Sequence, residues 1–219
     1  MLKLGEKGAI LQRDKQTYAI APSIPCGVIA PEQLRKIADV AEKYNAAALK
    51  LTSASRIAIV GLKEEDIDNV WKDLGMSPGH AVGLCVRSIK ACPGSTLCSL
   101  GQQDSLGMGM KLDEKYHGME LPSKTKMAVS GCSHQCAENC IKDISLVGKR
   151  SGWILMVGGR GTGKPRLAET LAEDLSSDQA LELISKVIDY YRDHAKGKER
   201  IGNMLDRIGL DTLKAAVCS

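Results

Sequence analysis

Five of the eight cysteines of this 219-residue chain lie between residues 92 and 140. They form two groups with fixed spacing, Cys-x5-Cys at Cys92 and Cys98 and Cys-x3-Cys-x3-Cys at Cys132, Cys136 and Cys140. Glycine, serine and asparagine residues surround both groups, which is typical of loops and not of apolar core faces. A [4Fe–4S] cube needs four thiolates that converge on it from roughly tetrahedral directions. The pattern therefore predicts a socket for an iron–sulfur cluster.

The spacing also indicates which thiols bind the cube. Residues 133–140 are predicted to form a short helix, on which cysteines four apart lie on one face. The N–H groups and dipole at the start of such a helix would stabilise an anionic cluster. Cys140 continues the same face, as a spare thiol or as a substitute ligand. We favour four cysteines as ligands, namely Cys92, Cys98, Cys132 and Cys136.

Two other interpretations of the cysteines stay open at this point. Free cysteines are common core residues and can be buried without any chemistry. A structural zinc site also uses clustered cysteines, although its usual Cys-x2-Cys pairs differ from the spacing seen here. Three further cysteines stand in apolar or terminal surroundings and are expected to do no chemistry: Cys26, Cys85 and Cys218.

Composition narrows the class of protein. Apolar residues make up 43% and charged residues 26% of the chain, and no apolar run is long enough to span a membrane. The first residues do not resemble a signal peptide, so we expect the cytoplasm, where thiols stay reduced. The net charge of +4 is small, aromatic residues make up 3% and phenylalanine is absent. We therefore expect neither a membrane nor a nucleic acid as partner.

Hydrophobic periodicity and turn residues predict an α+β order in the first third of the chain. A hairpin is expected at residues 8–12 and 17–21, followed by a helix over 31–44 that begins at Pro31. Two strand segments, 47–52 and 56–60, and a second amphipathic helix, 64–74, come next. This order favours a sheet with helices on one face. Residues 76–80 are a plausible boundary to a second domain.

The second part of the chain is predicted to contain further strands and a helical tail. It is expected to contain a helix at residues 97–116 and a strand at 126–130 that leads into the second cysteine group. A strand pair at 144–148 and 153–157 follows. Two tail helices are expected, one from Ser177 and one over 201–216. Ser177 is the expected N-cap of the first tail helix.

The cysteine pattern resembles a known family. Cys-x5-Cys followed by Gly-Cys-x3-Cys is the signature of the sirohaem-containing sulfite and nitrite reductases, and residues 47–62 and 143–161 resemble further segments of that family. The resemblance runs from about Pro31 to the C-terminus. Family enzymes usually contain two such halves in one chain, whereas this chain has room for one. It resembles the single-half, low-molecular-weight assimilatory-type sulfite reductases.

The resemblance implies the fold and the cofactors. It implies an α+β protein in which a ferredoxin-like half domain of sheet and helices, residues 1–78, precedes an α/β domain for sirohaem and the [4Fe–4S] cluster, residues 79–219. In the family the last cysteine bridges the cluster to the sirohaem iron, and that position here is Cys136.

Basic residues form the other side of the site that the resemblance implies. Lys124 and Lys126 resemble a Lys-x-Lys segment that lines the distal face of the sirohaem, and Arg87 resembles a substrate-binding arginine. Fixed positive charge binds an anion, and protons must reach its leaving oxygens. Arg56 lies two residues beyond the position of another active-site arginine, so on one strand it would share that position's face. Each of these cations can instead be a solvated surface charge. His134 could hydrogen-bond a sulfur or a haem carboxylate, or be an exposed loop residue.

A glycine-rich loop at residues 158–165 nearly matches a nucleotide-binding P-loop, but Pro165 stands where a hydroxyl should bind Mg²⁺. The loop suits anionic groups in general, and a plain surface turn is the alternative. From charge and from the family position, we expect five residues here to bind the carboxylates of sirohaem: Gly158, Gly159, Arg160, Lys164 and Arg166.

The sequence thus predicts an oxidoreductase with sirohaem and a [4Fe–4S] cluster that reduces sulfite to sulfide by six electrons, or nitrite to ammonia. No flavin- or nicotinamide-binding segment is apparent, so electrons are expected from an external carrier such as a ferredoxin. The alternatives are an electron-transfer protein with a cluster but no sirohaem, and a P-loop NTPase with a structural metal.

The spacing of lysine and cysteine bears on assembly. Lys126 precedes Cys132 by six residues, and six extended residues span roughly 20 Å. One strand would have difficulty in placing both residues at one haem. We therefore expect a homodimer in which each copy supplies bases to the other copy's cluster, whereas a bend near residues 130–131 would allow a monomer.

Overall fold

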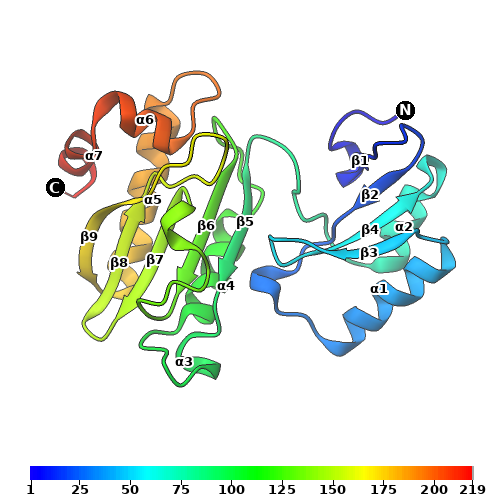
Figure 1. The fold of residues 1–219 in the computed structure, drawn as a ribbon, viewed down its shortest axis with the longest axis horizontal. Helices are drawn as coiled ribbons and strands as arrows, with labels where there is room; N and C mark the ends of the chain where they lie inside the picture. Colours follow the sequence, from blue (N-terminus) through cyan, green and yellow to red (C-terminus); the bar gives the residue numbers. More distant parts are fainter. Residues whose placement is uncertain (219) are drawn as a thin grey trace. The chain divides into compact units, whose positions relative to one another are not determined.

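The computed structural model describes residues 1–218. The chain divides into two units, Met1–Gly83 and Leu84–Ser219, and each forms its own sheet with its own helices (Figure 1). The predicted boundary at residue 78 lies a few residues before this division. Within residues 1–218, no helix combines the length and the apolar character that crossing a membrane requires.

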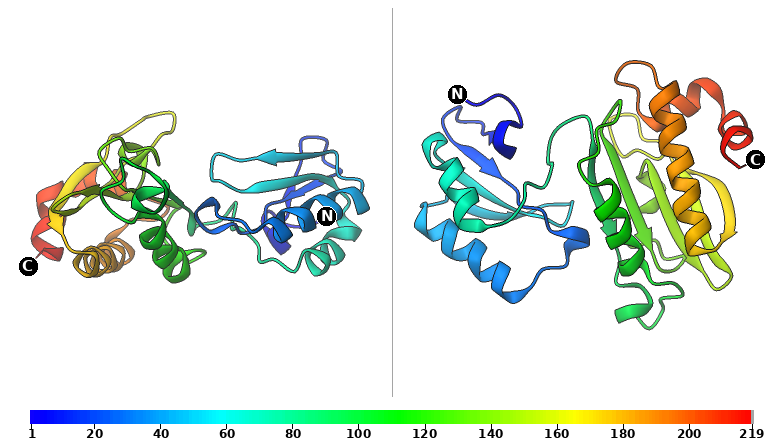
Figure 2. Two further views of the ribbon diagram at one scale, coloured as in Figure 1. Left: turned by 90° about the horizontal axis from the view of Figure 1, so that it is seen from below. Right: turned by 180° about the vertical axis from the view of Figure 1, so that it is seen from behind.

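The first unit is a four-stranded antiparallel sheet in the order β1-β2-β4-β3. Its strands are β1 (Ile10–Leu11), β2 (Tyr18–Ile20), β3 (Ala48–Leu51) and β4 (Ile57–Leu62). Helices α1 (Pro31–Lys43) and α2 (Ile67–Leu74) lie together on one face of this sheet (Figure 2). Three short 3₁₀ turns complete the unit: η1 (Glu6–Gly8), η2 (Pro25–Gly27) and η3 (Glu64–Asp66). The predicted α+β order of this part is confirmed.

The core of the first unit forms where the helices meet the sheet. Ile37 and Val70 from the two helices and Ile20 and Ile59 from the central strands are fully or almost fully buried in one cluster. Gly75 ends α2 in the left-handed conformation (φ 62°), as the sequence predicts for a helix C-terminus.

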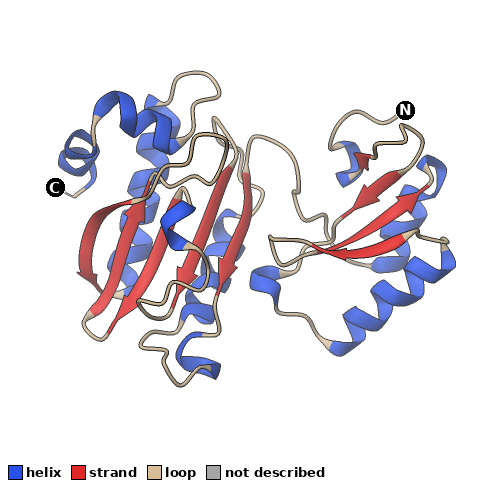
Figure 3. Ribbon diagram, viewed as in Figure 1, coloured by secondary structure: helices blue, strands red, loops and turns tan. Residues whose placement is uncertain are grey.

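The second unit is a five-stranded sheet in the order β5-β6-β7-β8-β9. The first three strands are parallel and the last two are antiparallel to their neighbours. Strands and helices alternate until β7 and the helical tail closes the unit (Figure 3). The elements are β5 (Val86–Ala91), α3 (Gly94–Leu97), α4 (Ser105–Tyr116), β6 (Thr125–Ser130), η4 (Asn139–Ile141), β7 (Ile144–Lys149), β8 (Gly152–Val157), β9 (Glu169–Leu175), α5 (Ser177–His194), α6 (Ile201–Ile208) and α7 (Leu210–Val217).

The two faces of this sheet differ. Val129, Leu146 and Leu155 are paired across β6, β7 and β8, and all are fully buried. Their face is covered by α4 and α5, which lie side by side on it (Figure 2). Side chains alternate between faces along a strand, so Ser130 and Val147 belong to the opposite face. That face carries η4 and the loop of the second cysteine group (Figure 1).

Several expected elements differ in the structure. The helix expected over 97–116 is two helices, because residues 98–104 form a separate loop. The tail helix expected over 201–216 is broken at Gly209, whose ψ of 153° is not helical. The N-cap of α5 is Ser176, which accepts from the backbone N–H of Gln179. Strands β5 and β9 were not predicted.

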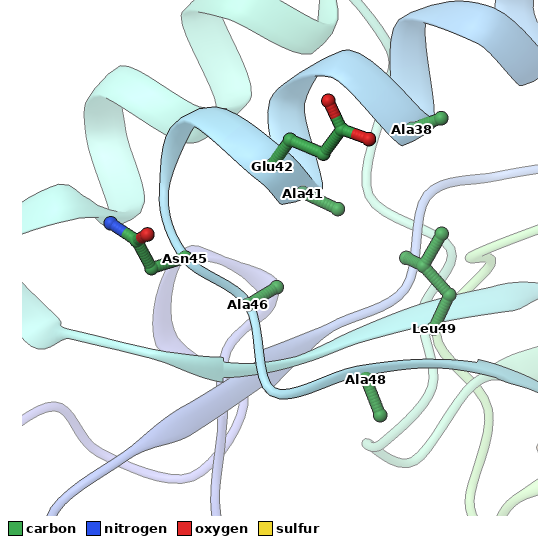
Figure 4. Close-up of a pocket in the computed structure, with 7 residues that line it drawn as sticks. All are labelled: Ala38, Ala41, Glu42, Asn45, Ala46, Ala48 and Leu49. Atoms are coloured by element: carbon green, nitrogen blue, oxygen red, sulfur yellow. The ribbon is translucent and has the colours of Figure 1, made fainter.

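A surface pocket of about 450 Å³ lies in the first unit between the end of α1 and β3 (Figure 4). Alanines form most of its wall, with Glu42, Asn45 and Leu49 at its sides. It contains none of the predicted site residues, and its lining offers one carboxylate and one amide.

The difference between the two faces of the second sheet can be tested by paired substitutions. We expect Leu155→Ala to lower the free energy of unfolding by about 2–5 kcal/mol, because a fully buried side chain leaves a cavity. Ile154 is half-buried and lies on the opposite face, so Ile154→Ala should lower the free energy of unfolding clearly less. Urea denaturation of both variants measures the difference, and equal losses would contradict the assignment of faces.

Candidate active site

The two cysteine groups meet because their strands are neighbours. Cys92 directly follows β5 and Cys132 follows β6, and the two strands are parallel with Ala91 paired to Val129. Both groups therefore leave the sheet at the same edge. The backbone N–H of Gly131 donates to the Cys92 Sγ atom (3.2 Å), which joins the two groups directly.

Glycines allow the loops at this edge to approach each other closely. A Cβ atom on Gly131 would stand 2.7 Å from both the carbonyl oxygen of Gln103 and the Cα of Gly94. A Cβ on Gly101 would stand 2.3 Å from the backbone of Gly94. The carbonyl of Gly131 accepts hydrogen bonds from the N–H groups of Gln102 (2.8 Å) and Gln103 (3.0 Å). Larger side chains would hold the two cysteine loops apart.

The loop of the second cysteine group is not the predicted helix. Residues 131–138 form turns, and only η4 is helical. Gln135 and Glu138 have positive φ angles of 51° and 62°, which no α-helix contains. Ser130 Oγ donates to Asn139 Oδ1 (2.5 Å) and accepts from the Ala137 N–H (3.1 Å). These buried side-chain contacts replace the helical backbone bonds.

Buried Asn139 fixes this loop on the sheet. Its side-chain amide donates to the carbonyl of Leu146 on β7 (2.8 Å), and Ser145 Oγ donates to the Asn139 carbonyl (3.1 Å). The argument that Cys132 and Cys136 share a helical face therefore does not apply, and their positions follow from loop contacts.

The predicted ligands differ in exposure. Cys132 is buried, Cys92 and Cys98 are half-buried, and Cys136 is exposed. His134 is exposed, and its Nδ1 atom lies 3.6 Å from Cys132 Sγ. Cys140 Sγ is half-buried and donates to Gln135 Oε1 (3.0 Å).

Within residues 1–218, no three histidine, cysteine, aspartate or glutamate side chains are grouped so as to hold one metal ion. A cube does not require such a group, since each thiolate binds a different iron.

A basic cluster lies on the same face of the sheet as this loop. Lys126 shares the face of Ser130, because the two residues are four apart on one strand. Lys126 is an exposed residue, but partial desolvation lowers the pKa of its ammonium, and the charges of Lys142, Arg200 and Lys124 lower it further. Lys124, in the loop before β6, is half-buried.

Two lysines of this cluster were not predicted from the sequence. Buried Lys142 donates to Glu138 Oε2 (2.8 Å), and Lys90 on β5 pairs with the same oxygen (3.2 Å). Glu138 thus ties the cysteine loop to β5. The signal in the sequence was weak, because Lys90 and Lys142 lie far apart in the chain and neither stands in a recognisable motif.

The structure also bears on the extended-strand argument. Asp143, which ends the segment after the cysteines, lies beside Lys126 at the start of β6, where its N–H donates to the Lys126 carbonyl (3.0 Å). The chain therefore turns back after residue 130, while residues 125–130 themselves are extended in β6, so the separation of Lys126 from Cys132 along the strand remains.

The structure does not assign the two predicted arginines, Arg87 and Arg56, to this basic cluster. Arg87 is half-buried at an irregularity of β5, between Val86 and Ser88, so strand alternation does not assign it a face. Arg56 belongs to the first unit and is buried beneath Gly79. It stands in the turn before β4, so the argument from a shared strand face does not hold there.

The glycine-rich loop packs against the cysteine loop. A Cβ atom on Gly159 would stand 2.6 Å from the carbonyl oxygens of Cys140 and Lys142. Gly158 has a φ of 83°, and its N–H donates to the carbonyl of Asp143 (2.8 Å). Close backbone approach to the segment 140–143 therefore requires glycine at Gly159. At Gly158 the positive φ favours glycine, and an added Cβ would stand 2.6 Å from Leu205 Cδ1.

Two of the three basic residues of the glycine-rich loop pair with carboxylates of the chain, and the third is exposed. Arg166 is held by Asp206 (2.8 Å) and by Glu169. Arg160 contacts Asp206 (3.3 Å), while its buried Nη1 atom has no hydrogen-bond partner in the described residues. Lys164 is exposed.

The P-loop interpretation is wrong. In a P-loop the phosphate-binding glycines lead directly into a helix, whereas here β9 follows the loop and pairs with β8.

Comparison with known proteins identifies the family. Residues 82–219 match the nitrite and sulphite reductase 4Fe-4S domain, and residues 10–77 match the nitrite/sulfite reductase ferredoxin-like half domain. The chain belongs to the nitrite and sulphite reductase family. Membership confirms the predicted fold class, the class of enzyme, and the pairing of sirohaem with a [4Fe–4S] cluster as cofactors.

Relatives of different length contain a segment similar to this chain. The assimilatory-type sulfite reductase of Nitratidesulfovibrio vulgaris is 44% identical, over 96% of this chain and 97% of its own. The nitrite reductase [NAD(P)H] of Bacillus subtilis is 40% identical over 95% of this chain, which spans 26% of that enzyme. A dissimilatory sulfite reductase I structure matches with a TM-score of 0.83 at 14% identity, over 93% of this chain and 69% of that chain. The last similarity concerns the fold alone.

Observations within the chain fit the family's cofactors. Cys92 Sγ accepts a backbone N–H and lies 3.3 Å from Ser105 Oγ, which suits a thiolate that carries negative charge. The unpartnered Arg160 Nη1 atom beside the cysteine loop suits a carboxylate of a bound group.

Close packing at Gly131 makes a prediction for cluster assembly. The added methyl of Gly131→Ala would overpack the junction of the two cysteine loops, which costs about 1–3 kcal/mol. We expect the purified variant to lose most of its iron and acid-labile sulfide. Gly163→Ala, where no atom lies within 4 Å of the added methyl, is the matched control and should keep both. Unchanged iron in both variants would contradict the importance of this junction.

Proposed function

We propose that this protein reduces sulfite to sulfide by six electrons, with Cys92, Cys98, Cys132 and Cys136 as ligands of the cluster and Cys136 as the bridge to the sirohaem iron. The single observation that supports this most is the convergence of the two cysteine groups on the sheet face that also carries Lys126. The family and the 44% identical sulfite reductase, which has nearly the same length as this chain, support the choice of reaction. When bound, the cofactors would pass on electrons from an external donor and provide the metal that binds the substrate.

The residues of the chain supply charge and protons. Sulfite is an anion whose oxygens leave as water, so cations that bind it and donors that protonate it are both needed. Lys126 and Lys124, with Lys142 behind them, concentrate positive charge on the open face of the sheet. We propose that Lys124, Lys126 and Arg87 bind the substrate, and that Arg160 and Lys164 bind carboxylates of sirohaem with Gly158 and Gly159. Arg166, which holds two carboxylates of the chain, would order this loop.

Electrons are proposed to come from an external one-electron carrier such as a ferredoxin, and the protein to act in the cytoplasm. Nitrite is the second candidate substrate, because nitrite reductases that contain a segment like this chain are up to 40% identical to it. The ratio of kcat/KM for sulfite and for nitrite, with one chemical electron donor, decides between the two substrates.

The visible spectrum of the purified protein tests the cofactors. We expect a Soret band and a red band from sirohaem in addition to the broad absorption of the cluster. A brown spectrum without these bands would indicate a cluster-only electron-transfer protein and would contradict the proposal.

Removal of the Lys126 charge tests the basic face. Lys126→Ala should keep the spectrum and lower sulfite turnover by at least about a hundredfold, the size of effect that a positioned acid provides. Lys186→Ala, on the exposed side of α5, should have wild-type turnover. If Lys126→Ala retains full turnover, the assignment of the basic face is wrong.

The lowered pKa of Lys126 gives a pH dependence. The protonated ammonium is the active form, and partial desolvation together with three neighbouring cations lowers its pKa from 10.5. Turnover should therefore fall with rising pH at a value below that of an ordinary lysine. Lys126→Arg should shift this alkaline limb upward, because a guanidinium stays charged. A limb that is the same in both proteins would show that another group titrates.

A further inference from the structure

Asp143 is a buried junction beside Lys126. Its carboxylate oxygen Oδ2 accepts the backbone N–H of Lys126 (2.8 Å), and its own N–H donates to the Lys126 carbonyl (3.0 Å). The carbonyl of Asp143 accepts the N–H of Gly158 (2.8 Å), at the start of the glycine-rich loop. One residue thus holds the backbone of Lys126 on both sides and also anchors the loop.

Arg200 completes this junction from the C-terminal part of the chain. Its Nε donates to Asp143 Oδ1 (3.0 Å) and its second guanidinium nitrogen to Oδ2 (2.6 Å). The side chains are 10% and 1% exposed, so solvent screens this pair little. The bidentate geometry fixes the direction of the carboxylate as well as its charge.

The arginine stands at the N-cap of α6, which packs tightly on the glycine-rich loop. A Cβ atom on Gly202 would stand 2.4 Å from the carbonyl oxygen of Gly158. One turn further, Asp206 of the same helix pairs with Arg160 and Arg166. Helix α6 therefore contacts both basic segments of the candidate active site through ionic groups.

We propose that Asp143 and Arg200 are positioning residues that hold Lys126 in place for the sulfite chemistry, an inference that rests on the proposed function. Lys126 stands at the start of β6, where the strand begins after a loop, and the carboxylate of Asp143 provides the hydrogen bond that fixes its backbone N–H. A fixed backbone directs the lysine side chain towards the open face. Without the arginine the carboxylate would be free to turn, and the ammonium would lose its defined position.

Charges from each packed element surround the Lys126 ammonium. Lys142, Arg200 and Lys124 oppose its protonation, and Asp143 favours it. The arginine thus acts on Lys126 through space as well as through the hydrogen bonds of Asp143.

A double-mutant cycle on the full-length protein with its cofactors tests this role. Binding of radiolabelled sulfite is measured by equilibrium dialysis in the wild type, in Arg200→Met, in Lys126→Gln and in the double variant. We expect Arg200→Met to weaken sulfite binding about tenfold in the wild-type background and less than about twofold in the Lys126→Gln background. Equal effects in the two backgrounds would overturn the proposal, since a purely structural role does not depend on Lys126.

Amide hydrogen exchange of the same proteins supplies a readout that does not depend on turnover or on sulfite. Arg200→Met should speed exchange at the start of β6 and leave β8 unchanged. The matched control is Arg207→Met on the same helix, whose guanidinium binds Glu199 and the His194 carbonyl and does not touch β6. It should leave sulfite binding and β6 exchange as in the wild type. Unchanged exchange in Arg200→Met would also overturn the proposal.

Arg200→Lys keeps the test valid if Arg200→Met fails to fold, because it keeps a charge beside the buried carboxylate and loses the bidentate contact. We expect a smaller loss of sulfite binding that again depends on Lys126. If instead Lys126→Gln alone binds sulfite like the wild type, the proposed basic face fails, and exchange in β6 still reports separately whether Arg200 fixes the strand.

Discussion

The parallel pairing of β5 with β6 is the constraint on which the candidate site depends. Because both strands end at one edge, the cysteine groups that follow them come together, although Cys132 follows Cys98 by 34 residues and Cys92 by 40. The N–H of Gly131 then reaches the sulfur of Cys92. Glycine at this point, and at Gly94 and Gly101, lets three backbone segments pack at distances that no side chain would permit.

The two faces of the second sheet carry different kinds of side chain. Its helix-covered face is filled by apolar side chains such as Leu146 and Leu155, which supply the hydrophobic stabilisation of the second unit. The opposite face holds hydroxyl and amide groups that fix the cysteine loop, and lysines that would otherwise repel one another. Glu138 and Asp143 offset that repulsion, since Glu138 pairs with Lys90 and Lys142, and Asp143 pairs with Arg200 and favours the charge of Lys126.

The C-terminal helices add a second level of organisation. Helix α6 places Arg200 against Asp143 and Asp206 against two arginines of the glycine-rich loop. Buried ionic contacts are costly unless their geometry is good, so their gain is in fixed geometry more than in stability. In this protein they tie helix α6 to the glycine-rich loop and to Asp143, which follows the second cysteine group.

How much could be predicted from the sequence depended on whether a signal was local. Helix α1 follows from Pro31 and an apolar stripe, α2 from its stripe and Gly75, and β7 and β8 from apolar runs around a turn. Strand β9 was missed because it is a polar edge strand. Among its seven residues, all of which the structure describes, Leu171 alone is fully buried. The helix expected at 133–140 failed because Ser130 and Asn139 outcompete helical bonds through contacts that no local pattern reveals.

For the site the same division holds. The sequence by itself determined the family and supplied the candidate thiols, since cysteine spacing and glycine positions are written in the order of residues. Only the tertiary structure decided that Lys90 and Lys142 share Glu138, that Arg166 is held by carboxylates of the chain, and that Arg200 reaches Asp143 across 57 residues. Such contacts depend on strand pairing and helix packing, which bring together residues that no sequence interval connects.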